Sequence, residues 1–260
     1  MRLSARRWLL GAGVVTAVAG SAFGQGLARA APAASYVPPR KPLHVGQSGA
    51  AVRSVQRRLT QLHYYAGPVD GRYGQDLLEA AWAFREVQGL RMNATTGAQP
   101  INRAFEKDLV HPRQPYTREP NGPASRIDID QNTEVMVLYE NSRPEWIFHV
   151  STGGGYYFCT PHGGPCGFAV TPDGEFHLQN RVSGWEQVPL GEMFNPIYFY
   201  PGFAIHGDIP VPWYPASHGC VRMWMDGAEW FWRDVSIGGA HPTPVFIWGR
   251  APYQLGYFGQ

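Results

Sequence analysis

Residues 205–223 read IHGDIPVPWYPASHGCVRM, and this stretch decides how the second half of the chain is interpreted. Cys220 follows a glycine here, with His218 two residues before it and His206 further upstream. Nucleophilic catalysis by a thiol needs an accessible sulfur, a base that takes its proton, and small residues that let backbone amides approach the reacting carbonyl. Because an unperturbed thiol has a pKa of about 8.5, a neighbouring imidazole raises its thiolate fraction at neutral pH.

Two other interpretations of these residues stay open at this point. A lone cysteine is usually a small buried hydrophobe. His206, His218 and Cys220 could instead bind zinc through two imidazoles and a thiolate, with Asp208 as the fourth ligand. Spacing alone does not separate a zinc site from thiol catalysis.

Upstream of this stretch, apolar residues recur with a period of two, which is typical of strands. They form three short runs: Ile127 and Ile129, then Val135, Val137 and Tyr139, then Trp146, Phe148 and Val150. Polar segments with turn potential separate the runs. The pattern predicts a β-meander that opens a mostly β domain over residues 125–250.

Residues 43–110 follow a different pattern, with apolar residues at helical spacings of three and four. One face holds Val52, Val55, Leu59 and Leu62, a second Leu77, Ala81 and Phe84, and a third Ile101, Phe105 and Leu109. Ser48-Gly49 precedes the first face, Gly89 follows the second, and the stretch AGPVDGRYG at residues 66–74 is dense in turn formers. We expect three short helices that share one small core.

Proline-rich segments flank these regions. Residues 31–42 hold four prolines and are interpreted as an extended leader. Residues 111–124 also hold four prolines, without periodic apolar residues, and are interpreted as a stiff linker between two domains. Residues 251–260 are left as a C-terminal tail.

The N-terminus has the parts of an export signal over residues 1–30: a basic start, an uncharged apolar run at 8–24, and a small-residue cleavage site at Ala28-Arg29-Ala30. The pair Arg6-Arg7 resembles a twin-arginine signal, and an ordinary secretory signal fits equally well. An uncleaved membrane anchor is a third alternative, because the 17-residue run is near the short limit of a membrane span.

Charge and composition restrict the choice of partners. The 260 residues carry a formal charge of +2, but without residues 1–30 there are 18 basic residues against 20 acidic ones, a net charge of −2. With no basic tract, this balance speaks against nucleic acid as a partner. A hydrophobic fraction of 44% is ample for a packed core, so the chain is not disordered as a whole.

Three cysteines in an exported protein leave one odd thiol. Cys159 and Cys166 bracket the segment TPHGGP at residues 160–165, so a disulfide between them would close a short loop and leave Cys220 free. In the alternative, both stay reduced or bind a ligand together with His162.

Several motifs resemble one enzyme family. Ser217-His218-Gly219-Cys220, followed by Val221-Arg222-Met223 and preceded by His206-Gly207, closely resembles the signature of L,D-transpeptidases with a YkuD catalytic domain. Ser151-Thr152-Gly153 and Thr171-Pro172-x-Gly174-x-Phe176 resemble further segments of that family. The resemblance covers roughly residues 125–250 and implies a YkuD-like β-sandwich or barrel.

The resemblance also implies roles for individual residues. Cys220 would be the nucleophile and His206 the base, while His218 would support the oxyanion pocket or orient the site. The backbone amides of Gly219 and Cys220 would hold the oxyanion.

Three further residues are expected to contact substrate: Arg222, Ser217 and Gly207. Arg222 stands where the family often has Asn, and it would hold a carboxylate or brace the loop. The interval of ten residues between His206 and Ser217 is shorter than in many family members.

The helical region resembles a second family. Its motifs look like the peptidoglycan-binding domain type 1, a three-helix module of bacterial cell-wall enzymes: Gly46-x-Ser48-Gly49, Val52, Gln56, Leu59, Tyr64-Tyr65 and Val69-Asp70-Gly71-x-Tyr73-Gly74. The alternative is a helical spacer, because Asp70 and Gly71 suit a turn in any protein.

Together the resemblances imply an exported, cysteine-dependent L,D-transpeptidase that forms 3→3 cross-links between peptidoglycan stem peptides through a thioester. The alternatives are an L,D-carboxypeptidase, in which water replaces the acceptor amine, a zinc-dependent wall peptidase, and a non-catalytic wall-anchoring protein. We expect no cofactor and no metal. The expected partners are peptidoglycan stem peptides and glycan, with the membrane involved only through a retained signal, and the expected location is the cell wall, the periplasm or the extracellular space.

Overall fold

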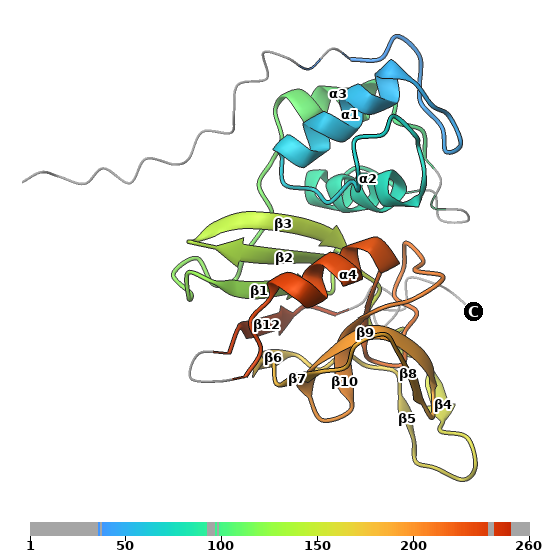
Figure 1. Cartoon of the computed structure of the whole chain (residues 1–260), viewed down its shortest axis with the longest axis vertical. Coiled ribbons are helices and arrows are strands. Elements are labelled where there is room, and N and C mark those ends of the chain that lie inside the picture. Colours follow the sequence, from blue (N-terminus) through green and yellow to red (C-terminus); the bar gives the residue numbers. More distant parts are fainter. Residues whose placement is uncertain (1–35, 37, 93–96, 98, 239–241, 251–260) are drawn as a thin grey trace, which may run out of the picture. The chain divides into compact units, whose positions relative to one another are not determined.

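Local sequence signals account for the three helices of residues 50–110 (Figure 1). The computed structural model describes residues 36, 38–92, 97, 99–238 and 242–250, so the predicted export signal at 1–30 and the tail at 251–260 lie outside the described residues. Helix α1 (Ala50–Gln61) follows Gly49 and buries its apolar face. Helix α2 (Gln75–Gln88) ends at Gly89, whose φ of 69° lies in the left-handed region that favours glycine.

Helix α3 (Arg103–Val110) is the shortest of the three, and a side chain caps it. The Phe105 backbone N–H donates to Asn102 Oδ1 at 3.2 Å, which satisfies one of the free donors at the helix start. The predicted three-helix segment is therefore confirmed.

A buried amide fastens helix α1 to the turn at residues 66–74. Gln56 Nε2 donates to Asp70 Oδ1 at 2.9 Å and to the Pro68 carbonyl at 3.1 Å, and the Gly71 N–H donates to Gln56 Oε1 at 2.7 Å. Gly71 has a φ of 80°. The motif formed by Gln56 and Val69-Asp70-Gly71 thus builds one hydrogen-bonded unit from two segments of chain.

The first β-sheet has the strand order β3-β2-β1-β12-β6. Strands β1 (Arg126–Asp130), β2 (Val135–Glu140) and β3 (Arg143–His149) form the antiparallel meander that the period of two predicts. Strand β12 (Pro244–Trp248) pairs with β1 in parallel, and β6 (Gly174–His177) pairs with β12 antiparallel. The mostly β class predicted for this half of the chain is confirmed.

The second sheet positions the histidine and cysteine of the opening motif. Its strand order is β11-β10-β9-β7, with β8 also paired to β9. The strands are β7 (Asn180–Arg181), β8 (Trp185–Val188), β9 (Gly191–Tyr200), β10 (Phe203–Gly207) and β11 (Val221–Met223). Helix α4 (Met225–Asp234), which the sequence analysis did not predict, follows β11.

Both faces of the meander are buried, against different partners. Val135, Val137, Tyr139 and Ile147 belong to one hydrophobic cluster with helices α1, α2 and α3, which we call the shared cluster. The alternate residues of the same strands, including Met136, Leu138 and Phe148, join a second cluster with both sheets and helix α4. The residues of the predicted alternation therefore divide between the two faces: those of β2 lie in the shared cluster, and those of β1 and β3 lie in the second cluster.

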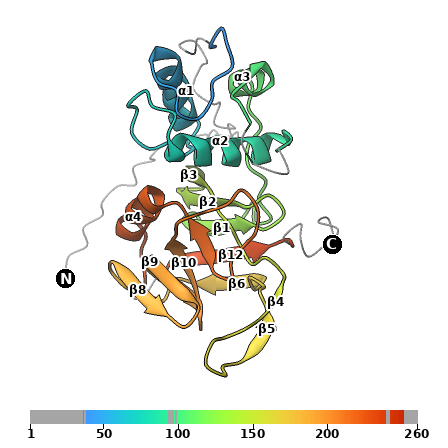
Figure 2. The ribbon, with the colours of Figure 1, turned by 90° about the vertical axis from the view of Figure 1, so that its right-hand side faces the viewer.

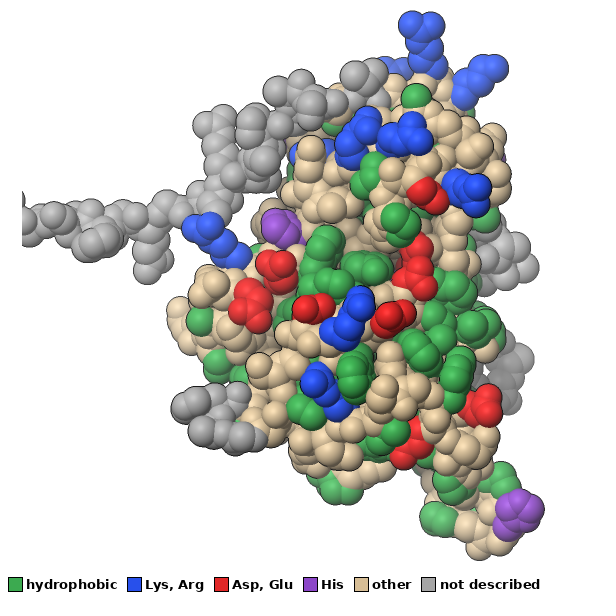
Figure 3. Space-filling model, viewed as in Figure 1, with side chains coloured by type: hydrophobic (Ala, Val, Ile, Leu, Met, Phe, Trp, Pro, Cys, Tyr) green, Lys and Arg blue, Asp and Glu red, His purple; other side chains and the backbone are tan. Residues whose placement is uncertain are grey.

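Residues 33–260 cluster as one compact unit that contains both the helices and the sheets. Backbone bonds join them directly: the Ile147 N–H donates to the His63 carbonyl at 2.7 Å, and the Tyr65 N–H donates to the Ile147 carbonyl at 3.1 Å. The proline-rich segment is also anchored, because the Arg113 N–H donates to Gln88 Oε1 at 2.7 Å. On the face in Figure 3, Lys and Arg side chains gather over the part that holds the helices.

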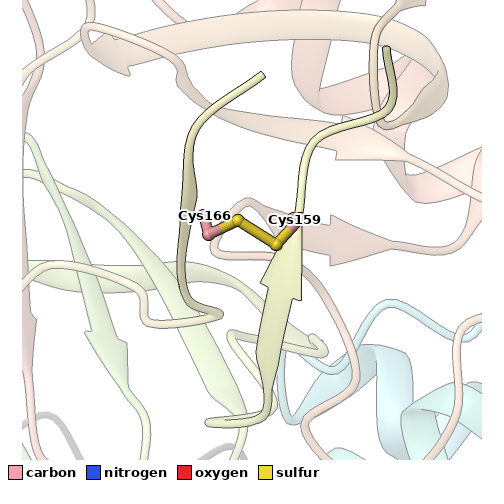
Figure 4. The surroundings of a disulfide bond; sticks show 2 residues. All are labelled: Cys159 and Cys166. Atoms are coloured by element: carbon pink, nitrogen blue, oxygen red, sulfur yellow. A yellow bond between two sulfur atoms is a disulfide. The ribbon is translucent and has the colours of Figure 1, made fainter. Parts of the chain in front are cut away.

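A short hairpin extends from the sheets as a separate arm (Figure 2). It consists of β4 (Tyr157–Cys159) and β5 (Cys166–Phe168), which pair antiparallel with Cys159 opposite Cys166. These two cysteines form a disulfide that closes the hairpin (Figure 4). Within the described ranges, no helix has both the length and the apolar character that a membrane crossing requires.

The shared cluster predicts that helices and strands unfold together. Ile147 is 1% exposed, so Ile147→Ala should lower the free energy of unfolding by about 2–5 kcal/mol. Denaturant unfolding should give one transition by circular dichroism and by tryptophan fluorescence. The control Val45→Ala alters a side chain that is 52% exposed and should change stability by less than about 0.5 kcal/mol. Separate transitions for helices and strands in the unmodified protein would contradict a shared core.

Candidate active site

Parallel pairing of β10 and β11 places His206, on β10, beside the chain that carries Cys220 directly before β11. The register places Ile205 opposite Val221 and His206 opposite Arg222, so Cys220 directly precedes the residue paired with Ile205. The two strands are connected by residues 208–220, and we call the first part of this connection, residues 208–216, the crossing loop. The short interval between His206 and Ser217 is therefore long enough to return the chain beside His206.

Residues Ser151-Thr152-Gly153, which follow shortly after β3, pair with the chain on both sides of Cys220. The Ser151 N–H donates to the Arg222 carbonyl at 2.9 Å, and the Arg222 N–H donates to the Ser151 carbonyl at 3.0 Å. The Ser217 N–H donates to the Thr152 carbonyl at 2.9 Å. A Cβ on Gly153 would lie 2.5 Å from the Ala169 carbonyl oxygen, so this close approach requires glycine.

Ser217 shapes the turn that presents the cysteine. Its side chain is buried, its Oγ donates to the Cys220 carbonyl at 2.5 Å, and the Gly219 N–H donates to that Oγ at 2.9 Å. Gly219 has a φ of 138°, and a Cβ there would lie 2.6 Å from the Phe203 ring. The amide expected at Gly219 as an oxyanion donor is thus engaged within the turn.

A cavity of about 290 Å³ lies beside the thiol. Five of the seven residues singled out from the sequence line it: His206, Ser217, His218, Cys220 and Arg222. The remaining two, Gly207 and Gly219, are buried and are not among its lining residues. The cavity is also lined by Thr160 of the hairpin arm, the β8–β9 turn, Tyr198, Gly202 and Asp208.

His206 is held in one tautomer. Its Nδ1 lies 2.9 Å from the Gly207 carbonyl oxygen, and because a carbonyl only accepts, Nδ1 carries the proton. Nε2 of the neutral ring is then an unprotonated acceptor. Burial lowers the pKa of His206, an effect that the Gly207 hydrogen bond and the Asp208 charge partly oppose. The Gly207 carbonyl thus orients this imidazole, and the expected contact of Gly207 with substrate stays a prediction.

Cys220 is partly exposed, and its thiol is not held by His206 in this structure. Its Sγ lies 3.9 Å from the Gly202 carbonyl oxygen, its hydrogen-bond acceptor. Burial raises the pKa of the thiol, while the Ala204 backbone amide and the Arg222 charge lower it. The two pKa directions favour a neutral thiol and a neutral imidazole over an ion pair in the free protein.

Arg222 is held by an ion pair, and His218 is held by an aromatic contact. Arg222 Nε lies 2.9 Å from Asp208 Oδ2, which braces the start of the crossing loop against β11. The His218 ring packs edge-on against Phe158 of the hairpin arm, with centroids 4.7 Å apart. Burial, followed by the Arg222 charge, lowers the pKa of His218.

Two supporting side chains lie beneath the site, and sequence reasoning missed one of them. Thr171 Oγ1, part of the predicted threonine-proline motif, donates to the Gly219 carbonyl and accepts from the Gly153 N–H, both at 2.8 Å. Glu134 accepts from the Thr152 N–H at 2.5 Å and from Thr152 Oγ1 at 2.6 Å. Burial raises the pKa of Glu134 to about 8. No local pattern indicates Glu134, because its partners lie 18 residues away.

The spacing of His206, His218 and Cys220 is also compatible with a zinc site. Within the described part of the chain, no group of three His, Cys, Asp or Glu side chains is placed so that it could hold a metal ion. Asp208, the fourth ligand in that interpretation, is paired with Arg222.

Comparisons with known proteins agree with this geometry. Residues 124–247 match the family described as the L,D-transpeptidase catalytic domain, YkuD, and residues 48–97 match the family described as a putative peptidoglycan binding domain. No curated protein is significantly similar to this chain.

Among solved structures, the chain is similar to an L,D-transpeptidase from Xylanimonas cellulosilytica DSM 15894, with 29% identity and a TM-score of 0.71 over 81% of this chain and 100% of that one. An L,D-transpeptidase from Stackebrandtia nassauensis is 15% identical, with a TM-score of 0.45 over 82% of this chain and 99% of that one. Over residues 124–247 the chain is thus similar to the L,D-transpeptidase catalytic domain, YkuD, and over residues 48–97 to a putative peptidoglycan binding domain.

Proposed function

We propose that this protein is an exported L,D-transpeptidase that joins peptidoglycan stem peptides by 3→3 cross-links through a thioester on Cys220. The observation that carries the proposal is the His206 tautomer, in which the Gly207 carbonyl holds the Nδ1 proton and leaves Nε2 as the base. His206 and Cys220 line the same cavity. The two peptidoglycan-acting domains support a location at the cell wall.

In the first step, a tetrapeptide stem enters the cavity and the thiol turns from Gly202 toward His206. Nε2 takes the thiol proton while sulfur attacks the carbonyl carbon of the third stem residue. The C–N bond to the terminal D-alanine then breaks, and the proton passes from His206 to the departing amine. A thioester on Cys220 remains.

In the second step, the side-chain amine of a neighbouring stem attacks the thioester. His206 accepts the amine proton and returns it to the departing sulfur, so that the thiol is regenerated and a new amide links the two third residues. If water replaces the amine, the same steps release a tripeptide, which is the L,D-carboxypeptidase alternative.

The backbone amide of Cys220 is the proposed oxyanion donor. The Gly219 amide, expected for that role, is hydrogen-bonded to Ser217 Oγ. Arg222 lines the cavity with its charge partly neutralised by Asp208. Its proposed role is to brace the loop and to lower the pKa of the thiol. In the free protein the Arg222 charge already acts in this direction, against the larger effect of burial.

The nucleophile can be identified by covalent trapping with a carbapenem. The strained lactam carbonyl is a good electrophile for an activated thiol, and the ring-opened amine stays tethered to the adduct. Intact-mass measurement and peptide mapping should place one adduct on Cys220, because Cys159 and Cys166 form a disulfide.

Cys220→Ala should fold and form no adduct, and Cys220→Ser should also fail, because a hydroxyl is a far weaker acid than a thiol. Circular dichroism provides the folding control for both variants. An adduct that persists in Cys220→Ala, or activity lost to a chelator without any adduct, would overturn thiol catalysis.

The pH dependence of acylation follows from the two pKa directions. Burial places the pKa of His206 below its ordinary 6.5 and raises that of Cys220 above the ordinary range of a thiol. The base form of His206 therefore persists below pH 6.5, and we expect the carbapenem acylation rate to stay constant through neutral pH and to fall only below the ordinary histidine range.

His206→Gln should lower the rate about 10²–10⁴-fold and remove this acidic limb. The control His44→Gln changes an exposed histidine and should leave the profile unchanged. An acidic limb centred at about pH 7 or above would instead indicate that the thiol must ionise before it attacks, or that a different group is the base.

A further inference from the structure

The end of strand β3 holds the crossing loop by side-chain hydrogen bonds. His149 Nε2 lies 3.0 Å from the Pro212 carbonyl oxygen. Two residues later, Ser151 Oγ donates to the Tyr214 carbonyl at 2.7 Å and accepts from the Ala216 N–H at 3.1 Å. Residues 149 and 151 therefore hold two alternate carbonyls, those of Pro212 and Tyr214, in the loop that leads from His206 toward Cys220.

The other side of His149 faces helix α2. Its side chain is fully buried; its ring meets the Trp82 ring edge-on with centroids 5.2 Å apart, and Nε2 lies 4.0 Å from Glu79 Oε2. Ile147, two residues earlier on β3, exchanges backbone hydrogen bonds with His63 and Tyr65. The same strand end is therefore held by the helices on one side and holds the crossing loop on the other.

A second contact joins these parts. Trp82 Nε1 donates to the Gly97 carbonyl at 2.8 Å. Gly97 lies so close to Trp213 of the crossing loop that a Cβ at this position would lie 2.2 Å from Trp213 Cδ1. Trp82 thus contacts both His149 and the residue that packs on the crossing loop.

The polarity of His149 is directed at the loop. Because the Pro212 carbonyl only accepts, Nε2 carries the proton, and Nδ1 is a buried atom without a partner among the described residues. Burial lowers the pKa of His149 to about 4 and raises that of Glu79 well above its ordinary value, so both groups are neutral. An apolar residue would fill this space without leaving Nδ1 unsatisfied, so packing alone does not explain a histidine here.

The geometry points to His149 as a positioning residue that holds the crossing loop in register and couples the peptidoglycan-binding helices to the active site through Trp82, His149 and Pro212. This inference rests on the proposed function for the roles of His206 and Cys220. In reactions that need a fixed approach of nucleophile to carbonyl, a misplacement of about 1 Å can lower the rate about 100-fold.

The test compares His149→Leu with His149→Gln in the full chain. Leucine cannot donate to Pro212, whereas the glutamine amide nitrogen can replace Nε2. We expect His149→Leu to be acylated by a carbapenem about 10- to 100-fold more slowly and His149→Gln to recover most of the rate. The matched control is Leu109→Ala, a buried residue of the shared cluster on α3, which should lower stability without changing acylation.

Hydrogen exchange provides a readout that does not depend on the chemistry. In His149→Leu, amide exchange over residues 208–217 should accelerate by about tenfold, the effect of losing one hydrogen bond, and exchange in Leu109→Ala should not change there selectively. Unchanged exchange and acylation in His149→Leu would overturn the inference, as would equal defects in the leucine and glutamine variants. Failure of the unmodified protein to acylate would refute the proposed function, while local exchange in the crossing loop would still decide the role of His149.

Discussion

The burial of both faces of the β1–β2–β3 meander is the constraint on which the rest of the structure depends. One face packs on the helices through Val135, Val137 and Ile147, and the other packs on the second sheet and helix α4. Burial of apolar surface contributes about 25 cal/mol per Å² to the stability of the folded state, and these strands gain this contribution on both faces. Without the helices or without the second sheet and α4, one apolar face of the meander would be exposed to water. The helical segment is therefore part of the core that supports the catalytic domain.

The same strands continue into the site. After β3 leaves the core, Ser151 and Thr152 pair with the chain on either side of Cys220, and Glu134 holds Thr152 from below. The cysteine turn is thus built from backbone hydrogen bonds and buried side chains rather than from a mobile surface loop. Such rigidity suits a reaction in which a neutral thiol must meet a neutral imidazole and a carbonyl in one geometry.

Much of the fold and site could be predicted because the signals are local. Helical periodicity, Ser48-Gly49 and Gly89 define helix ends within a few residues, and the period of two defines the meander. The Ser217-His218-Gly219-Cys220 motif identifies the turn because Gly219 and Ser217 have backbone duties that few other residues can perform. The expected domain boundary at residues 111–124 rests on the prolines alone and stays a prediction, while the core shared by helices and strands follows from contacts distant in sequence.

The run VMVLY at residues 135–139 is a sequence signal for the shared core, because five successive apolar residues indicate a strand buried on both faces. No comparable signal exists for His149 or for the roles of Gly207 and Gly219. The His149 partner Pro212 lies 63 residues away, and the Gly219 amide is taken by Ser217 only in the folded turn. These contacts depend on the tertiary arrangement.

The most direct measurement of the central claim is the structure of the product formed from a purified tetrapeptide stem and an isotopically labelled acceptor stem. Tandem mass spectrometry should find a dimer in which the donor has lost its terminal D-alanine and its third residue is joined to the side-chain amine of the acceptor's third residue. A dimer in which the donor keeps its fourth residue, or no conversion of either stem, would contradict acyl transfer from the third residue through Cys220.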